Sequence, residues 1–455
     1  MHPATPVPAH EPTQHNVISS TGWNRRHLLR TMAGMAVALP AAGLLAACGD
    51  DEPAASAEFP TGPVTLSFYW WGGESRAKLT DDALNLYTKM HPNVTITRTW
   101  QAFTGYYDKL ATISAGGNAP DIFQIDDNGL AEYASRNVTL DLSPYTKSGA
   151  IDVSKHPKSL TEYGQLKGKQ VAIATGENTP AIIYDKTVLT ELGMALPKVG
   201  MTYEEMITWG AEVTTKKGGG YWGLMDPSSD YKALWLWLRA QGKEFYSDNK
   251  IAFSEADLIA WFQLWVDART KGAVPPADVV HEAVTGSVAT QLVVTKKAAV
   301  SFMWSNQLSE MQKATKNDLA MTAYPGDPKG QWARASTYWA ASRTTKNAVV
   351  VADLINFLVN NVEAGKVQGV DRGLPSNLDV RTAVSESLTD QKMKDTVAFE
   401  NEITPKFGPA PAPPPKGHSG LRNTLRDIAE TVTYGKATPE AAAKQFFAQA
   451  TAALA

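Results

Sequence analysis

Two adjacent carboxylates are the side chains in this sequence that are best placed to do chemistry. Asp126 and Asp127 follow the apolar run at residues 122–125. If a strand continues through them, they point to opposite faces, which is a poor arrangement for an acid and a base that share one bond. At the carboxyl end of a strand they are well placed to bind a ligand instead. The alternative is that one or both cap the helix that follows.

A pair of tryptophans is the second candidate. The run Trp-Trp-Gly-Gly at 70–73 closes another apolar strand, so Trp71 and Gly72 lie where side chains project over the edge of a sheet. An indole stacks on the apolar face of a pyranose, while carboxylates and amides bind its hydroxyls. Alternation along the strand turns at least one of the two indoles into the core. These residue types together favour a sugar-binding site.

Motifs for bond-making chemistry are missing from the sequence. It has no G-x-S-x-G elbow, no G-x-x-x-x-G-K-[ST] loop and no H-E-x-x-H pair. Its histidines are scattered, and its single cysteine, Cys48, can form neither a disulfide within the chain nor a cysteine-rich metal cluster. We therefore expect no catalytic residue, no metal and no cofactor. A net charge of -3 argues against a protein that neutralises phosphates, so we expect no nucleic-acid partner.

The first 47 residues have the pattern of an export signal. Arg25 and Arg26 precede an uncharged stretch at 31–47, which is rich in small residues and short for a membrane span. The arginine pair resembles a twin-arginine signal. The run Leu-Ala-Ala-Cys that ends at Cys48 resembles a lipobox, in which the cysteine receives lipid. We expect residues 1–47 to be removed, Cys48 to be lipidated, and 48–61 to form a tether that anchors the protein outside the cytoplasm, in the periplasm or on the outer face of the cell membrane.

Strand and helix patterns alternate along the rest of the chain. Strand patterns at 64–70, 94–100 and 121–125 enclose helical patterns at 79–90 and 106–115, and this βαβ order predicts an α/β lobe with a parallel sheet. Capping boxes open helices at Thr202 and Ser254. Roughly 400 residues are too many for one ordinary core, so we expect two α/β lobes. Further strands are expected at 171–174, 181–184 and 298–302, and further helices at 349–359, 421–433 and 439–453.

Other tryptophans fall on expected helices. Trp261 and Trp265 form an i, i+3, i+7 stripe with Leu258, which is explained most simply as a face packed into a core. In the run Trp-Leu-Trp-Leu at 235–238, the sequence does not show which side chains face the core. We assign Trp237 to the core and keep Trp235 as a candidate for a binding cleft.

Four segments resemble the bacterial extracellular solute-binding proteins that serve carbohydrate ABC importers, a family that includes the maltose-type binding proteins. They occur in the family's order and are LSFYWWGG at 66–73, YDKL at 107–110 with AGGNAPDI at 115–122, TGENTPAIIYDK at 175–186, and KAAVSFMWSN at 297–306. Weaker similarities are YWAAS at 338–342 and RGLPS at 372–376. Together these segments cover most of residues 62–455.

The resemblance implies the two-lobed periplasmic-binding-protein fold, an α/β fold in which a hinge joins two lobes around a ligand cleft. By the family's topology, lobe 1 comprises 62–178 and 341–382, and lobe 2 comprises 179–340 and 383–455. By this resemblance, the membrane permease is expected to recognise the closed form that holds the ligand. The protein would therefore act by hinge motion and not as an enzyme.

Ligand-binding positions carry over from the family residue by residue. Asn178 lies where some maltose-type members carry a carboxylate, so their ligand does not transfer to this chain. The residues that match cleft-facing positions of the family are Trp71, Gly72, Asp126, Asp127, Asn178, Trp304, Asn306, Tyr338, Trp339 and Arg372.

Residues and resemblance together predict a lipoprotein that binds a mono- or oligosaccharide for an ABC importer. Its partners would be the sugar, the permease subunits and, through the lipid anchor, the membrane; a monomer is expected. Carboxylates near the cleft could favour an amino sugar. One alternative is a receptor of the same fold for a glycerophosphodiester or a polyol, since an aromatic cage can hold a cationic headgroup. Another is a secreted enzyme that acts on glycosides, which would need two carboxylates facing each other.

Overall fold

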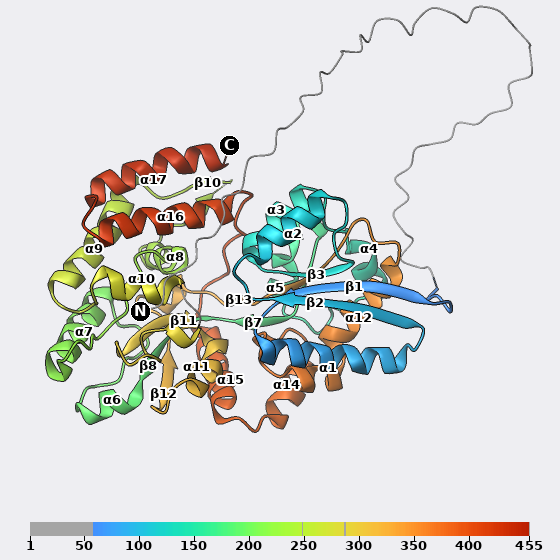
Figure 1. Ribbon diagram of the computed structural model, residues 1–455, viewed down its shortest axis with the longest axis horizontal. Helices are drawn as coiled ribbons and strands as arrows, with labels where there is room; N and C mark the ends of the chain where they lie inside the picture. Colours follow the sequence, from blue (N-terminus) through green and yellow to red (C-terminus); the bar gives the residue numbers. More distant parts are fainter. Residues whose placement is uncertain (1–57, 248, 286–287, 455) are drawn as a thin grey trace, which may run out of the picture. The chain divides into compact units, whose positions relative to one another are not determined.

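The computed structural model describes residues 58–247, 249–285 and 288–454. Two sheets form the centres of two lobes, and a third, small sheet joins them (Figure 1). The described residues belong to one compact unit. The expected export signal, Cys48 and most of the expected tether lie outside the described residues.

Lobe 1 is built on a five-stranded sheet with the order β2-β1-β3-β14-β6. β1 pairs in parallel with β2 and β3, as the βαβ pattern predicts, whereas β14 is antiparallel to β3 and β6. The sheet is therefore mixed, and β6 is only half as long as the expected strand at 171–174. The strands are β1 (Val64–Trp71), β2 (Val94–Gln101), β3 (Ile122–Ile125), β6 (Ile173–Ala174) and β14 (Tyr338–Ala341).

Helices cover both faces of this sheet. Alternate residues of β1 face opposite sides, so that Phe68 and Trp70 pack in the core toward α1 and α12, whereas Tyr69 and Trp71 pack toward α2 and α3. The helices of lobe 1 are α1 (Glu74–Met90), α2 (Tyr106–Ala115), α3 (Asp127–Ser135), α4 (Ser143–Ser148), α5 (Lys158–Tyr163), α12 (Ala348–Asn360), α13 (Val362–Gln368) and α14 (Leu378–Ser387), and a small hairpin pairs β4 (Gln165–Leu166) with β5 (Lys169–Gln170).

Lobe 2 has a three-stranded antiparallel sheet with the order β11-β8-β12. Its strands are β8 (Pro180–Asp185), β11 (Val300–Trp304) and β12 (Leu319–Thr322), with a hairpin of β9 (Tyr246–Ser247) and β10 (Lys250–Ile251). Its helices are α6 (Lys186–Glu191), α7 (Tyr203–Lys217), α8 (Tyr231–Ala240), α9 (Glu255–Thr270), α10 (Ala277–Thr285), α11 (Leu308–Lys313), α15 (Gln391–Ile403), α16 (His418–Thr433) and α17 (Pro439–Leu454), and its 3₁₀ turns are η1 (Val288–Thr290), η2 (Ser305–Gln307), η3 (Pro328–Gly330) and η4 (Thr404–Lys406).

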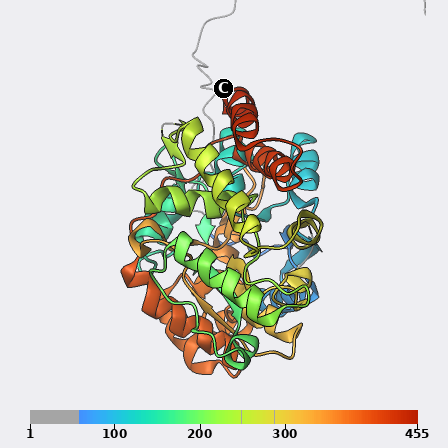
Figure 2. The same ribbon diagram turned by 90° about the vertical axis from the view of Figure 1, so that its left-hand side faces the viewer.

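The core of lobe 2 confirms most of the sequence-based expectations for its helices. Capping boxes at Thr202 and Ser254 open α7 and α9. Trp261 and Trp265 are buried on α9, which packs against α16 and α17. α16 and α17 lie side by side near the C-terminus (Figure 2). Trp235, kept as a candidate for a binding cleft, is a core residue instead, because α8 turns this indole into the core, where it is 2% exposed.

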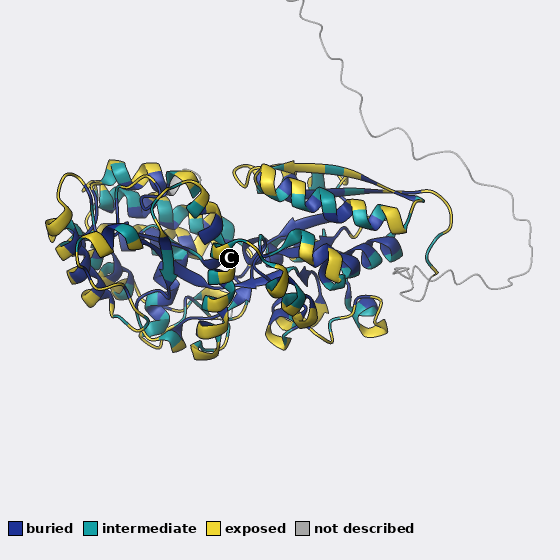
Figure 3. Ribbon diagram, turned by 90° about the horizontal axis from the view of Figure 1, so that it is seen from below, coloured by how far each residue is buried: buried dark blue, intermediate teal, exposed yellow. Residues whose placement is uncertain are grey.

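A three-stranded sheet joins the lobes. Its order is β13-β7-β15, from β7 (Gly176–Asn178), β13 (Arg334–Ala335) and β15 (Leu374–Pro375). The segments that cross between the lobes are largely buried (Figure 3). The chain passes from β7 directly into β8 of lobe 2, close to the expected crossing at 178. The expected return at 341 falls inside β14, all of which pairs in lobe 1, so the chain returns to lobe 1 before Tyr338.

Membrane-spanning character is weak in the described part of the chain. None of its helices is by itself long and apolar enough to cross a membrane. Only α12 and α13 taken together reach the required length and composition, and the pair is bent by 67°.

Candidate ligand-binding site

The side chain of Asp126 caps α3. One carboxylate oxygen accepts the hydroxyl of Tyr107 at 2.5 Å and the backbone N–H of Asn128 at 3.1 Å, and the other accepts the side-chain amide of Asn128 at 2.7 Å. The hydroxyl of Tyr107 in turn accepts the backbone N–H of Asp126 at 2.9 Å. The capping alternative therefore holds for Asp126, and both of its oxygens have partners within lobe 1.

Asp127, in the first turn of α3, forms a buried ion pair with Arg334 of the joining sheet. Burial raises the pKa of the Asp127 carboxyl against the opposing effect of Arg334. For Arg334, burial favours loss of the charge, but the facing Asp127 outweighs it and raises the pKa of the guanidinium. The ion pair ties the end of the lobe 1 sheet to the segment that crosses between the lobes.

The indole of Trp304, at the end of β11 in lobe 2, lies beneath two cations. The central carbon of the Arg334 guanidinium is 3.8 Å from the ring centroid, and the ammonium of Lys232 is 4.4 Å from it. Lys232 also donates to the carbonyl of Met303 at 3.1 Å and lies 3.5 Å from the carboxylate of Asp230. Burial lowers the pKa of Lys232 to about 8. Cations over an indole face are attracted to it, so Trp304 connects lobe 2 to the joining sheet.

The first turn of α16 in lobe 2 reaches α3 in lobe 1. Nε2 of His418 lies 2.9 Å from the side-chain oxygen of Asn128, and the hydroxyl of Ser419 donates to the backbone carbonyl of Asn128 at 3.1 Å. On the other side of the ring, Nδ1 of His418 lies 2.7 Å from the hydroxyl of Tyr246. The polar side chains that meet where the lobes touch are called the interlobe cluster below; they are Asp126, Asp127, Asn128, Trp304, Arg334 and His418.

Three buried polar atoms near this cluster have no hydrogen-bond partner among the described residues. They are the hydroxyl oxygens of Tyr163 and Tyr338 and Nε of Arg334. Burial raises the pKa of both tyrosines well above 10, with the charge of Asp127 among the further causes, so both hydroxyls keep their protons. An unsatisfied buried polar group costs about 1–3 kcal/mol. A ligand that offers hydroxyl groups could satisfy these atoms.

Asn178 forms a second link between the lobes. Its amide donates to the side-chain oxygen of Asn306 in lobe 2 at 3.0 Å, and the amide of Asn306 donates to the backbone carbonyl of Asp371 in lobe 1 at 3.2 Å. The side-chain oxygen of Asn178 is buried without a partner in the described part of the protein. Two of the residues expected from sequence are therefore in direct contact at the hinge.

Trp71 lies behind the carboxyl edge of the lobe 1 sheet. Its ring packs edge-on against Phe103, with centroids 5.5 Å apart, and lies 6.0 Å from the ring of Tyr107. Gly72 follows it directly, where a Cβ atom would collide with the side chain of Arg76. Trp71 therefore supports the wall that carries Tyr107, the residue whose hydroxyl binds Asp126.

Trp339 and Arg372 lie apart from the interlobe cluster. Alternation along β14 turns Trp339 away from the side of Tyr338 and into the core beside α1, where it is fully buried. Arg372 lies 5.0 Å from that ring and donates to the side chains of Gln124 at 3.1 Å and Thr80 at 2.8 Å. These two residues, expected at the cleft, are core residues of lobe 1 in this structure.

Five residues at or next to the cluster were not expected from the sequence. The signal for Tyr107 was present, because it opens the YDKL segment of the family resemblance. No local pattern marked the others, since each acts through a partner distant in sequence: 207 positions separate Asp127 from Arg334, and 290 separate Asn128 from His418. The five are Tyr107, Asn128, Lys232, Arg334 and His418.

Histidine and carboxylate side chains do not gather into a metal site in the described ranges. His156 binds Asn360 in lobe 1, whereas His281 and His418 belong to separate parts of lobe 2. Among residues 58–247, 249–285 and 288–454, no group of three or more His, Cys, Asp or Glu residues is arranged to hold a metal ion.

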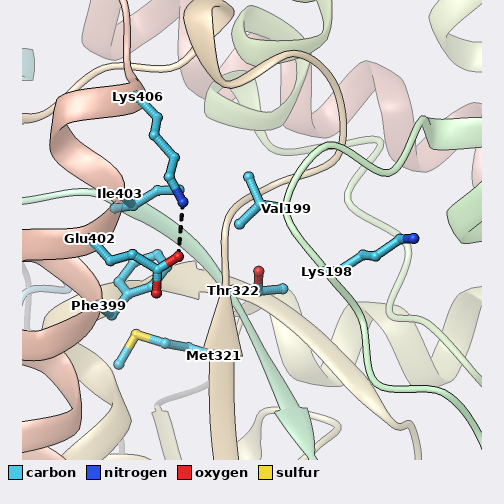
Figure 4. Close-up of a pocket in the computed structure, with 8 residues that line it drawn as sticks. All are labelled: Lys198, Val199, Met321, Thr322, Phe399, Glu402, Ile403 and Lys406. Atoms are coloured by element: carbon cyan, nitrogen blue, oxygen red, sulfur yellow. Dashed lines mark hydrogen bonds and ion pairs between the residues drawn. The ribbon is translucent and has the colours of Figure 1, made fainter.

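A separate hollow of about 360 Å³ lies on lobe 2, between α15 and β12 (Figure 4). Apolar side chains line much of it, including Val199, Met321 and Phe399, and an ion pair of Glu402 with Lys406 at 2.8 Å borders it. None of the residues of the interlobe cluster lines this hollow.

Comparison with known proteins identifies the family. A family description, the bacterial extracellular solute-binding proteins, matches residues 82–401. Among solved structures, a family 1 extracellular solute-binding protein of Alicyclobacillus acidocaldarius is 28% identical, with a TM-score of 0.65 over 87% of this chain and 99% of the other. An oligogalacturonide-binding protein of Yersinia enterocolitica, in complex with saturated digalacturonic acid, is 20% identical, with a TM-score of 0.76 over 86% and 98%.

A third solved structure has the same fold. It is an ABC substrate-binding protein of Listeria monocytogenes in complex with cycloalternan, 18% identical, with a TM-score of 0.73 over 86% of this chain and 98% of the other. The family match spans well over half of the chain, and the two-lobed fold agrees with it. The chain therefore belongs to the bacterial extracellular solute-binding proteins, a family that binds solutes outside the cytoplasm.

Proposed function

We propose that this protein captures a sugar in the interlobe cluster and delivers it to an ABC permease. The observation that carries the proposal is that buried polar atoms without partners lie near an indole where the lobes meet. The atoms are the hydroxyls of Tyr163 and Tyr338 and Nε of Arg334, and the indole is that of Trp304. Aromatic faces and hydrogen-bonding groups of these kinds suit a sugar ring and its hydroxyls. Two proteins of the same fold bind saturated digalacturonic acid and cycloalternan.

Each residue of the site receives a proposed role. Trp304 would stack on the sugar ring, and Asp127 would accept a sugar hydroxyl while it stays paired with Arg334. The free side-chain oxygen of Asn178 would accept another hydroxyl at the hinge. Tyr338 would donate from the lobe 1 sheet, so that the ligand contacts both lobes and the joining sheet at once.

Charges around the cluster favour an uncharged sugar. Asp126 and Asp127 are balanced by Arg334 and by Arg422, whose guanidinium lies 5.8 Å from the ring of Phe103 on the opposite lobe. Both oxygens of Asp126 are already used, and Asp127 faces Arg334. A positively charged amino group would therefore find no free carboxylate, so we favour a neutral sugar over the amino sugar considered from the sequence.

Delivery rests on closure and anchoring. A ligand that contacts both lobes stabilises their closed arrangement, and the permease would recognise that arrangement.

We propose that the protein acts as a monomer, tethered to the membrane through lipid on Cys48. Lipidation is tested by detergent-phase partitioning of the protein expressed in a bacterial host. The wild type is expected in the detergent phase and Cys48→Ser in the aqueous phase; wild-type protein in the aqueous phase would remove the anchor from the proposal.

A thermal-shift screen tests the sugar assignment. The chain carrying Cys48→Ser, otherwise complete, is mixed with maltotriose, digalacturonate, glucosamine and glycerophosphocholine, because a ligand that binds only the folded state raises the melting temperature. We expect a neutral saccharide such as maltotriose to raise it and to be recovered unchanged. A shift with glycerophosphocholine alone would replace the sugar with a phosphodiester, and recovery of cleaved saccharide would overturn the receptor assignment.

A further inference from the structure

His418 is completely enclosed at the contact between the lobes. It is the first residue of α16 and is 1% exposed. Its ring packs edge-on against Tyr231 of α8, with centroids 4.8 Å apart, and one nitrogen reaches across to Asn128 in lobe 1. A histidine in this place is covered only while the lobes touch, because α3 belongs to the other lobe.

The hydrogen bonds fix which nitrogen of His418 carries the hydrogen. Asn128 uses its amide to donate to Asp126, so its side-chain oxygen is the atom that faces Nε2 of His418 and must accept. Nε2 therefore carries the hydrogen, and Nδ1 accepts the hydroxyl of Tyr246 at 2.7 Å. Both nitrogens are satisfied by a neutral ring.

The groups around His418 disfavour a second proton. Tyr246 of β9 and Tyr231 of α8 face it as neutral phenols, and Arg422 of its own helix and Arg334 of the joining sheet bring positive charge. Asp126 is screened from it by Asn128, which lies between them in the hydrogen-bond chain. Burial, followed by the charges of Arg422 and Arg334, lowers the pKa of His418 to about 3.

We propose that His418 positions the two lobes in the closed form through Asn128, and that protonation of His418 opens them. A proton on Nδ1 would reverse this hydrogen bond, so the hydroxyl of Tyr246 would have to accept and its own hydrogen would lose His418 as a partner, in a pocket that already holds positive charge. When the lobes separate, the ring meets water, which accepts the charged form. Acid therefore favours the open form, and since we propose that closure holds the sugar, acid would also release it; this second step rests on the proposed function.

The size of the effect follows from linkage. An imidazole that titrates at its ordinary value of 6.5 when the lobes are apart, and at about 3 when they touch, favours opening by about 30-fold at pH near 5 relative to neutral pH. His418→Gln should abolish this effect, because its amide can still donate toward Asn128 but does not titrate in this range. His418→Leu removes the donor as well, so it should favour the open form at every pH.

Small-angle X-ray scattering measures the separation of the lobes directly. The complete chain with Cys48→Ser is compared with the same chain carrying His418→Gln, His418→Leu or His156→Gln, at pH near 7.5 and near 5, alone and with maltotriose or digalacturonate. His156 is the matched control: it is also buried, burial lowers its pKa too, and it binds Asn360 within lobe 1. We expect the unsubstituted chain and His156→Gln to expand in acid, His418→Gln to stay compact, and His418→Leu to be expanded at both values.

The two proposals fail separately. Expansion of His418→Gln in acid to the same extent as the unsubstituted chain would overturn the role of His418, as would an unsubstituted chain whose size does not change with pH. Failure of every saccharide to bind would overturn the proposed function, while the scattering of the unliganded chain would still report on His418. Sugar binding with no dependence on pH between these values would keep the receptor and exclude the switch.

Discussion

The guanidinium of Arg334 lies 3.8 Å above the indole of Trp304, between that ring and the carboxylate of Asp127. Arg334, in the joining sheet, therefore contacts Asp127 of lobe 1 and Trp304 of lobe 2 at the same point. The same contact covers part of the ring on which a sugar would stack. Under the proposed function, ligand binding and lobe contact would depend on the same three side chains.

The first prediction concerns the ion pair of Asp127 with Arg334. Removing one partner, by Asp127→Leu or Arg334→Met, leaves a buried charge unpaired and should lower the free energy of unfolding by about 3–5 kcal/mol. The double variant should lose much less than the sum of the two single losses. Urea denaturation near neutral pH measures the loss in free energy of unfolding for the two single variants and the double variant.

The matched control for this comparison of single and double variants is Arg98→Met. Arg98 forms a partly exposed ion pair with Asp81 at 3.4 Å, for which the expected loss is at most about 1 kcal/mol. Additive losses at Asp127 and Arg334 would show that the two side chains are not coupled, contrary to their contact in the structure.

The second prediction concerns stacking on Trp304. Trp304→Ala should weaken binding of the sugar found by the screen about 10-fold, since loss of an aromatic contact is worth up to about 1.5 kcal/mol. Trp100→Ala is the control. Trp100 is 40% exposed and pairs across the sheet with Trp70, which puts it on the face opposite to Trp71. Titration calorimetry should show an unchanged dissociation constant for Trp100→Ala, and equal losses in both variants would contradict the proposed site.

The sequence predicted those parts of the fold that depend on local pattern. The alternation at 64–70 and 94–100, with a helix between, is complete in a short window, and the capping boxes at Thr202 and Ser254 need only four residues each. The joining sheet could not be predicted in this way. Its strands have two or three residues each, so no hydrophobic period exists in them, and their pairing is set by contacts between distant segments.

The candidate site was predictable in part for the same reason. Asp126, Asp127 and Trp304 end strands or follow them directly, and the ends of the strands meet at the lobe junction. Arg334 and His418 carry no such mark, because their role comes from partners far away in the chain. The misplacement of Trp339 arose because the YWAAS resemblance names a segment, whereas alternation along a strand sends its neighbouring side chains to opposite faces.

The third prediction concerns the buried acid Glu400 on α15, beside the hinge. Its carboxyl accepts the backbone N–H of Thr179 at 3.0 Å and the hydroxyls of Thr179 and Ser305. Burial raises its pKa to about 8, with the charge of Glu177 adding to the rise. The folded state therefore holds a proton that the unfolded state releases at its ordinary value of 4.5.

The sign of the pH dependence follows directly. Because the pKa is raised on folding, the contribution of Glu400 to stability is complete below pH 4.5 and is lost as the pH rises toward 8. The loss is at most about 1.4 kcal/mol for each pH unit. Glu400→Gln imitates the neutral acid and should remove this loss. In urea denaturation, the free energy of unfolding of Glu400→Gln should therefore increasingly exceed that of the wild type from pH 5 to 8. Glu402→Gln, on the exposed face of the same helix, is the control. An equal slope for the wild type and Glu400→Gln would show that Glu400 is ionised in the folded protein.

The last prediction concerns Gly373, at the edge of the joining sheet. Its φ of +86° is one that side chains rarely adopt, and a Cβ atom there would collide with the backbone carbonyl of Glu177 in β7. Gly373→Ala should therefore destabilise the protein by more than the strain alone, which is about 1–2 kcal/mol. Gly149→Ala isolates that strain, because Gly149 has a left-handed backbone with a φ of +81° and open space around its Cβ position. The difference between the two variants in urea denaturation measures how closely β15 must approach β7. Equal losses would mean that the strands can separate at little cost, in which case the joining sheet does not hold the lobes in register.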